Sequence, residues 1–209
     1  GAVVVGDGEA AAAGQLLDRL LDLAWQRRRD FVFEIEPVAD SLARAGELED
    51  GPVILVDHGD NCGAGGPQDN MDVLAEVLRL GFEQVAAGPV WDPASVARMV
   101  EAGVGAEVTL QLGGKTDSPS MELRGQPLEV SGTVSCITDG RFTVRGPMAT
   151  GTRMNMGRTA VLRNGDIDIV VSERRFEPYD IGCFTHAGVD PAQKKYVLMK
   201  LKHLKNKLK

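Results

Sequence analysis

The sequence is poor in cysteine and has no long apolar segment. Its cysteines, Cys62, Cys136 and Cys183, are odd in number and far apart, which argues against a disulfide framework or a zinc ribbon. We therefore expect a reducing, cytoplasmic setting. No apolar run approaches the ~20 residues of a membrane span, and the opening GAVVVGDGEA lacks the basic flank of a signal peptide. Because the chain begins with Gly rather than Met, we expect a trimmed chain or a fragment.

Histidine is also scarce, and this limits the metal chemistry that the chain can perform on its own. The histidines are His58, His186 and His203. A catalytic metal site usually needs three protein ligands, and none of these histidines stands in a motif with ligand spacing. We therefore expect no metal site built from this chain alone.

The net charge of −7 hides an asymmetry along the chain. Residues 193–209 hold seven lysines and no acid, whereas the rest of the chain carries 16 basic against 30 acidic residues. An acidic body is a poor nucleic-acid binder, because contacts to phosphate dominate that affinity. We expect no nucleic-acid or membrane partner. The end LKHLKNKLK, within residues 200–209, indicates a solubilising or vector-derived tail; an amphipathic helix for a membrane surface or a partner is the alternative.

The first part of the chain predicts helices. Leu16, Leu17, Leu20 and Leu21 recur at helical spacing, so residues 1–30 are predicted to be mostly one amphipathic helix. A short strand or link over 31–35 and a second helix over 37–45 follow. With 209 residues, 43% of them hydrophobic, the chain can bury a core of one domain or one and a half.

The middle of the chain alternates between buried strands and helices. Strands are predicted over 52–56, 84–90 and 106–112, with helices over 69–80 and 92–103 between them. Asp92 and Pro93 form a helix start, as N-cap and first helical residue. This alternation predicts parallel crossover units.

Beyond residue 120 the pattern changes to hairpins. Residues 128–138 are predicted to pair with 141–145 across Asp139-Gly140, and 159–163 with 166–171 across Asn164-Gly165. A short helix over 179–187 and a last strand over 195–199 complete the reading. The predicted fold class is α/β: parallel βαβ units followed by antiparallel β-hairpins, in a mixed sheet with flanking helices.

Chemistry concentrates in PVILVDHGDNCGAGG, residues 52–66, where a strand ends in a polar loop. Function in α/β sheets gathers at such strand ends. The polar residues of this loop could bind a metal, hold a polar substrate or orient other groups; they are Asp57, His58, Asp60 and Asn61. A nucleophile pair of Cys62 with His58 stays open beside the alternative of a structural thiol.

Two further features could meet an anion. The glycine-rich loop Gly63–Gly66 precedes a helix and is typical either of an anion cradle of free backbone N–H groups or of a tight turn. Lys115 follows two glycines and is either an anion contact or an exposed turn residue. These features support an alternative function, a non-enzymatic module that binds an anion or small molecule.

Three motifs together resemble one known family. The chain contains VDHGDNCGAGGPQDN, then AAGPVWDPASVARMVEAGVGAEVTLQLGGKTD, and later NGDIDIVVSERRFEPYD. In this order they resemble the C-terminal part of the microcystinase C (MlrC) family of metallopeptidases, from about Arg27 to Tyr196. The resemblance implies three segments: residues 1–36 as the remnant of a preceding N-terminal domain, 37–199 as the α/β domain, and 200–209 as a tail that is not native.

The resemblance implies a zinc-dependent hydrolase of peptide or amide bonds, which in the best-known members acts on linearised microcystin fragments. Its zinc ligands belong to a larger N-terminal domain, so we expect zinc in the complete protein and no hydrolysis by this chain alone. The partners implied are a peptide or amide substrate and that N-terminal domain; a homo-oligomer is left open. The residues expected on the substrate side are Asp57, Asp60, Asn61, Gly63, Gly65, Gly66, Asp92, Pro93 and Lys115. His58 receives no catalytic role.

Overall fold

The computed structural model describes residues 1–32, 36–117 and 124–201. The chain divides into two compact units, residues 1–37 and 38–209. The first unit contains helix α1 (Ala10–Gln26) and a 3₁₀ turn at Arg28–Phe31. The helix therefore begins later than predicted. Residues 33–35 of the predicted link lie outside the described part of the chain.

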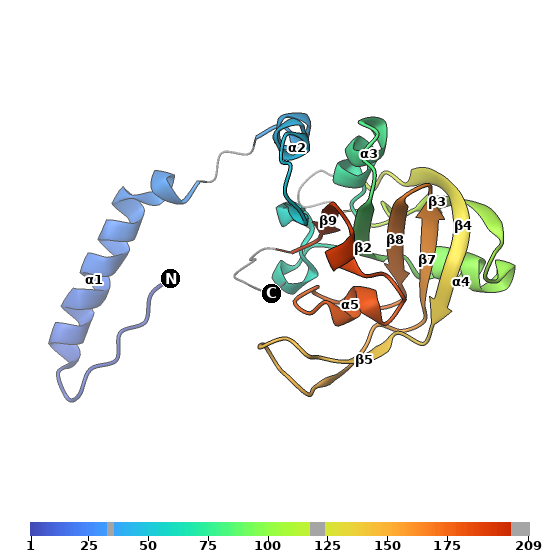
Figure 1. The fold of residues 1–209 in the computed structure, drawn as a ribbon. Coiled ribbons are helices and arrows are strands. Elements are labelled where there is room, and N and C mark those ends of the chain that lie inside the picture. The colour runs from blue at the N-terminus through green and yellow to red at the C-terminus, as the bar shows by residue number, and fades with distance from the viewer. Residues whose placement is uncertain (33–35, 118–123, 202–209) are drawn as a thin grey trace. The chain divides into compact units, whose positions relative to one another are not determined.

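The second unit is built on a seven-stranded mixed sheet, which confirms the predicted fold class (Figure 1). The strand order is β1-β9-β2-β8-β7-β4-β3. The strands are β1 (Val53–Val56), β2 (Val85–Trp91), β3 (Glu107–Leu112), β4 (Leu128–Thr138), β7 (Thr159–Asn164), β8 (Ile167–Ser172) and β9 (Tyr196–Met199). β1, β9, β2 and β8 pair in parallel, and β8, β7, β4 and β3 pair antiparallel. A separate pair joins β5 (Arg141–Thr143) to β6 (Arg153–Asn155).

Alternating side chains of the parallel strands build a core on each face of the sheet. One face packs against helices α2 (Val38–Gly46), α3 (Asp72–Arg79) and α4 (Pro93–Ala102), through buried residues such as Leu42, Val77 and Met99. The other face packs against the short helix α5 (Gly182–Thr185), whose Phe184 is buried there. A 3₁₀ turn at Pro191–Gln193 leads into β9.

Local signals fixed several element ends correctly. Asp92 is the N-cap of α4, accepting the N–H of Ser95 at 3.0 Å, with Pro93 as first residue and Gly103 at positive φ after the last turn. The Asn164-Gly165 hairpin joins β7 to β8 as predicted. The start of α3 differs from the predicted range of 69–80, because the helix begins at Asp72 with Met71 as its N-cap.

Two predicted strand pairings are wrong. The segment after Asp139 does not pair with β4, because both edges of β4 already carry β3 and β7; it pairs with β6 instead. The third strand of the predicted crossover series, β3, does not join the parallel half. Both positions beside β2 are occupied by β9 and β8, so β3 pairs antiparallel with β4 at the far edge.

The antiparallel half of the sheet curls around α4. This helix contacts β3, β4, β7 and β8. Gly113 directly follows β3, yet its N–H donates to the carboxylate of Asp92, which directly follows β2, at 2.9 Å. This hydrogen bond brings the end of β3 next to the end of β2, although the two strands are far apart in the strand order.

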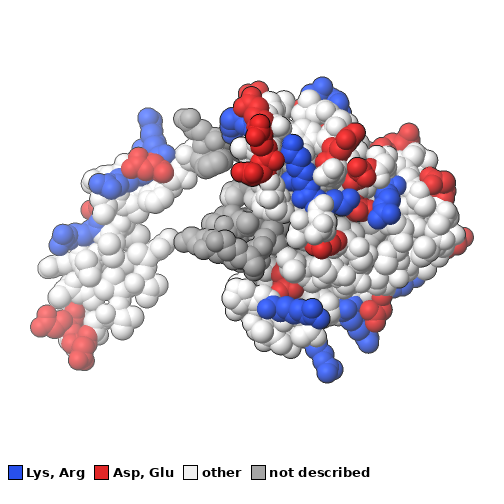
Figure 2. Space-filling view, in the orientation of Figure 1, with Lys and Arg blue, Asp and Glu red and all other residues white. Residues whose placement is uncertain are grey.

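Surface charge of both signs is mixed. On the face shown in Figure 2, Lys and Arg side chains alternate with Asp and Glu over the second unit. None of the helices in the described ranges combines the length and apolar character needed to cross a bilayer.

Candidate functional site

The polar segments that follow five strands meet in one place, which we name the strand-end junction. Four of these strands are parallel, so their carboxyl ends share one edge of the sheet, and the curl of the sheet adds the end of β3. The junction comprises Asp57–Asn70 after β1, Trp91–Ser95 at the end of β2 and just after it, Gly113–Thr116 after β3, Glu173–Glu177 after β8 and Lys200 after β9.

Lys200 lies at the centre of the part of the junction that the ends of the parallel strands form. Its ammonium lies 3.0 Å from Oδ2 of Asp57 and 2.8 Å from Oδ2 of Asp60, and it also donates to the carbonyl of Asn70. Only 6% of its side chain is exposed. Lys200 and the buried Leu201 therefore belong to the folded unit, although the sequence placed them in a solvated tail.

The buried cluster holds two carboxylates and one ammonium. Burial by itself lowers the pKa of Lys200, but the charges and hydrogen bonds of Asp57 and Asp60 outweigh burial and raise it. Burial raises the pKa of Asp60, and the charge and hydrogen bond of Lys200 offset this only in part. Lys200 is therefore charged, and Asp60 is protonated more easily than an exposed aspartate.

Asp60 also shapes the loop that follows it. Its Oδ1 accepts the N–H of Gln68 at 2.6 Å and its Oδ2 accepts the N–H of Asn70 at 2.8 Å. Gln68 has a positive φ of 62° and is fully buried. Its side-chain amide exchanges two hydrogen bonds with the backbone of Phe176, which ties this loop to the segment after β8.

The glycine-rich loop offers no free donors to an anion. Gly63 N–H donates to Oδ1 of Asn61, and the N–H groups of Ala64, Gly65 and Gly66 donate to the carbonyls of residues 61 and 62. The carboxylate of Glu177 accepts from Asn61 at 3.1 Å and lies against Gly63, where a Cβ would meet it at 2.3 Å. Of the two alternatives for this loop, these hydrogen bonds favour the tight turn over a cradle of free N–H groups.

Two more carboxylates, one in the loop after β1 and one directly after β2, bind the segment after β3. Asp69 Oδ2 accepts the N–H groups of Lys115 and Thr116 and the Thr116 hydroxyl, each at 2.9 Å. Asp92 accepts from Ser95 and Gly113, and the Lys115 ammonium lies 2.7 Å from its Oδ2. Burial by itself raises the pKa of Asp92, but hydrogen bonds from Lys115 and Ser95 outweigh it and lower the pKa.

The remaining expected pair, Cys62 with His58, lacks the properties of an activated nucleophile. Burial and the nearby charge of Glu177 raise the pKa of the Cys62 thiol, which favours the unreactive protonated form. His58 lies on the exposed surface. The junction thus brings together Asp57, Asp60, Asn61, Asp92 and Lys115, and hydrogen bonds within the chain hold all of them.

The described residues do not fit a zinc site. Among them, no group of three or more His, Cys, Asp and Glu side chains could hold a metal ion. Where two carboxylates do converge, at Asp57 and Asp60, the Lys200 ammonium stands between them and supplies the positive charge.

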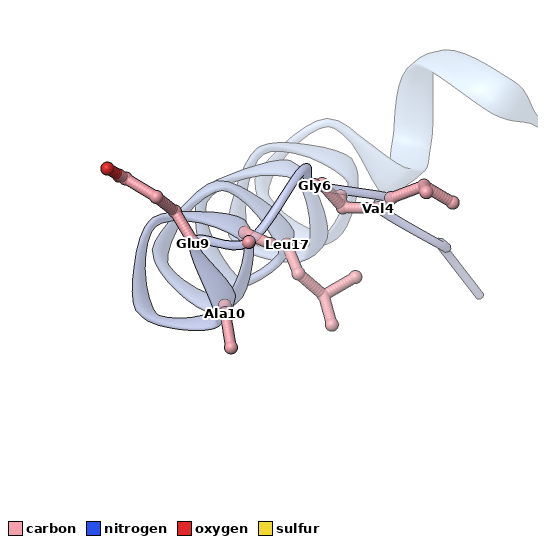
Figure 3. Close-up of a pocket in the computed structure, with 9 residues that line it drawn as sticks. Val4, Gly6, Glu9, Ala10 and Leu17 are labelled. Atoms are coloured by element: carbon pink, nitrogen blue, oxygen red, sulfur yellow. The ribbon is translucent and has the colours of Figure 1, made fainter.

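The first unit contains a hollow of about 570 Å³ between the N-terminal segment and α1 (Figure 3). Its lining is apolar or small apart from one carboxylate, as the labelled residues Val4, Gly6, Glu9, Ala10 and Leu17 show. Apart from Glu9, none of the residues that line it has a group that could perform acid, base or nucleophilic chemistry at a substrate.

Several junction residues were missed by sequence reasoning. Lys200 was hidden in a lysine-rich end, although it directly follows a buried strand. Gln68 and Asp69 carry no local signal beyond a polar loop. Arg175 places its guanidinium over the ring of Trp91 at 3.6 Å. The sequence indicated this segment only through ERRFEP, which is part of the motifs that carry the family resemblance.

Comparison with known proteins decides the family. The family model of the MlrC C-terminus matches residues 55–209. The chain belongs to the MlrC C-terminal family. This MlrC chain is 36% identical over 172 residues to microcystinase C of Sphingomonas sp, a match that covers 82% of the chain.

A solved structure is similar across nearly the whole MlrC chain. The crystal structure named "Putative metallopeptidase" from Mesorhizobium sp. BNC1 is 28% identical, with a TM-score of 0.78 over 93% of this chain. The similarity covers only 31% of microcystinase C and 38% of the Mesorhizobium chain. The MlrC chain described here thus spans about a third of the relatives that it matches.

Proposed function

We propose that this chain is the C-terminal part of a zinc-dependent hydrolase of peptide or amide bonds, and that the strand-end junction is the substrate-side wall of its cleft. The observation that carries the proposal is the match to microcystinase C, which spans 31% of that protein. The zinc ligands in this proposal come from the part of such a protein that the chain does not span.

The contacts of the junction support a role as a wall rather than as the reacting centre. Its carboxylates are committed to internal partners, with Asp60 and Asp92 nearly fully buried. Groups held in this way cannot approach a scissile bond, but they fix the loops that present the surface. Exposed residues of those loops, such as Gly65 and Pro93, are then available to a substrate.

Helix α1 gives independent support for a neighbouring domain. None of its residues is buried, and Leu16, Leu20 and Leu23 are each more than 40% exposed. Most of the stability of a helix in a protein comes from the packing of its apolar face, so the exposed leucines of this 17-residue helix favour a covering surface. In the proposal, the preceding N-terminal domain covers it.

The test is a chimera. The chain replaces the matching third of microcystinase C, and zinc content and hydrolysis of a linear peptide are measured for the chimera and for the chain alone. We expect the chain alone to hold less than one zinc and to hydrolyse nothing, and the chimera to recover both zinc and hydrolysis. Stoichiometric tight zinc on the chain alone, or a folded, zinc-loaded chimera without hydrolysis, would contradict the proposal.

A further inference from the structure

Three motifs that lie far apart in the sequence converge on the side chain of Arg175. Its guanidinium stacks over the ring of Trp91 at 3.6 Å, and its Nε donates to the carbonyl of Pro67 at 2.9 Å. The platform is itself fixed, because the indole N–H of Trp91 donates to the carbonyl of Glu173 at 3.0 Å. The stack and the hydrogen bond together hold the guanidinium in one orientation.

The charge of this guanidinium has no acidic partner among the described residues. The neighbouring acids are engaged elsewhere, since Glu173 pairs with Arg158 at 2.6 Å and Glu177 accepts from Asn61. Arg175 is exposed, and within residues 1–32, 36–117 and 124–201 its Nη1 and Nη2 make no hydrogen bond. The Nη1 and Nη2 edge of the guanidinium, which can bind a carboxylate through two hydrogen bonds, therefore faces solvent with its donors unused.

We propose that Arg175 is a carboxylate-binding residue of the junction, and that it selects peptides carrying a free carboxylate. The proposal rests on the proposed function, because it assigns a ligand to the cleft wall. A guanidinium presents two parallel N–H donors that match a carboxylate, and ordering the side chain beforehand removes part of the entropic cost of binding. Lysine, a flexible point charge, cannot reproduce this geometry.

Trp91 provides a direct readout, since a ligand on Arg175 changes the surroundings of its ring. Trp25, the other tryptophan, is replaced by phenylalanine so that Trp91 is the only reporter. Three N-acetylated peptides that differ only in their carboxylates are titrated. The first has an internal Gln and a free C-terminal carboxylate, the second has an internal Glu and an amidated C-terminus, and the third has the internal Gln and an amidated C-terminus.

We expect saturable fluorescence changes with a carboxylate peptide and binding about tenfold weaker, or absent, for the fully amidated peptide. The stronger of the first two peptides identifies whether the carboxylate is terminal or on a side chain. Arg175→Gln should lose the preference, and Arg175→Lys should keep only a small part of it. Arg174→Gln is the matched control, because it removes the same charge from the adjacent exposed residue and should leave the preference unchanged.

Equal binding of all three peptides, no saturable binding by any of them, or an unchanged preference in Arg175→Gln would overturn the proposal. Circular dichroism and thermal unfolding show whether each variant is folded, and Arg175→Lys gives a second, milder test if the glutamine variant is not. The titration measures peptide binding to the chain alone and needs neither zinc nor hydrolysis. Its failure is therefore distinguishable from failure of the chimera experiment.

Discussion

Two lysines hold carboxylates at the strand-end junction, but they do so in different surroundings. Lys200 is 6% exposed and binds Asp57 and Asp60, and Asp60 also fixes the loop after β1. Lys115 is 37% exposed and binds Asp92, which caps a helix and receives the end of β3. The same pair of chemical groups therefore differs in what is left behind when the lysine is removed. In the first case two buried carboxylates lose the cation that they share, and in the second a single buried carboxylate keeps Ser95 and Gly113 as donors.

The comparison predicts the largest effect for Lys200→Met. Removing the ammonium leaves two carboxylates without their cation in a buried site, so we expect the free energy of unfolding to fall by about 3–5 kcal/mol. Urea unfolding followed by circular dichroism measures this. A second substitution, Asp57→Asn, should recover part of the loss. A loss below about 1 kcal/mol for Lys200→Met would show that the cluster is hydrated rather than buried.

A pH series isolates the contribution of Asp92. Its pKa is lowered in the folded chain, so the stability it gives is fully present above the unfolded value of about 3.9 and is lost as the pH falls through the folded value. Asp92→Asn should cost about 1–3 kcal/mol at pH 7, and this difference should shrink below about pH 4. Urea unfolding of both proteins between pH 7 and pH 2 measures it. A difference that is constant with pH would contradict the assignment.

Lys115→Met should have a smaller effect than Lys200→Met. The carboxylate of Asp92 keeps its donors Ser95 and Gly113, and water can reach the position that the ammonium leaves. We expect a loss of about 1 kcal/mol in the same urea measurement. A loss equal to that of Lys200→Met would remove the distinction between the two lysines.

The baseline of the comparison is an ion pair on the surface of a helix. Arg79 and Glu76 pair on the surface of α3 at 2.5 Å. Arg79→Gln should give no measurable change in the urea midpoint, because solvent screens this pair. A clear shift would mean that surface pairs contribute more in this protein than their exposure indicates.

Sequence reasoning succeeded where the signal is local. The start of α4 at Asp92 and Pro93 and the Asn164-Gly165 turn depend on residues that neighbour one another, so they were predicted correctly. The loop residues Asp57 and Asp60 were also identified from their place after a strand. Their role as buried partners was not, because that role needs a cation 143 residues away from Asp57.

The failures have the same physical origin. Whether a strand finds an edge depends on which strands already occupy the sheet, and no local pattern reports that β4 is filled on both sides. Likewise, the alternation of Leu and Lys at the end of the chain is typical of a solvated segment. Lys200, just before this segment, is buried only because β9 places it against the loop after β1, where Asp57 and Asp60 lie.

The place of β9 has a consequence for folding during synthesis. Among the strands in the described ranges, β9 comes latest in the chain, yet it lies between β1 and β2 and pairs with both. Until Tyr196–Met199 and Lys200 have been synthesised, β1 lacks its neighbouring strand and the loop after β1 lacks its cation. Chains interrupted before this point are therefore expected to expose the centre of the sheet to proteases.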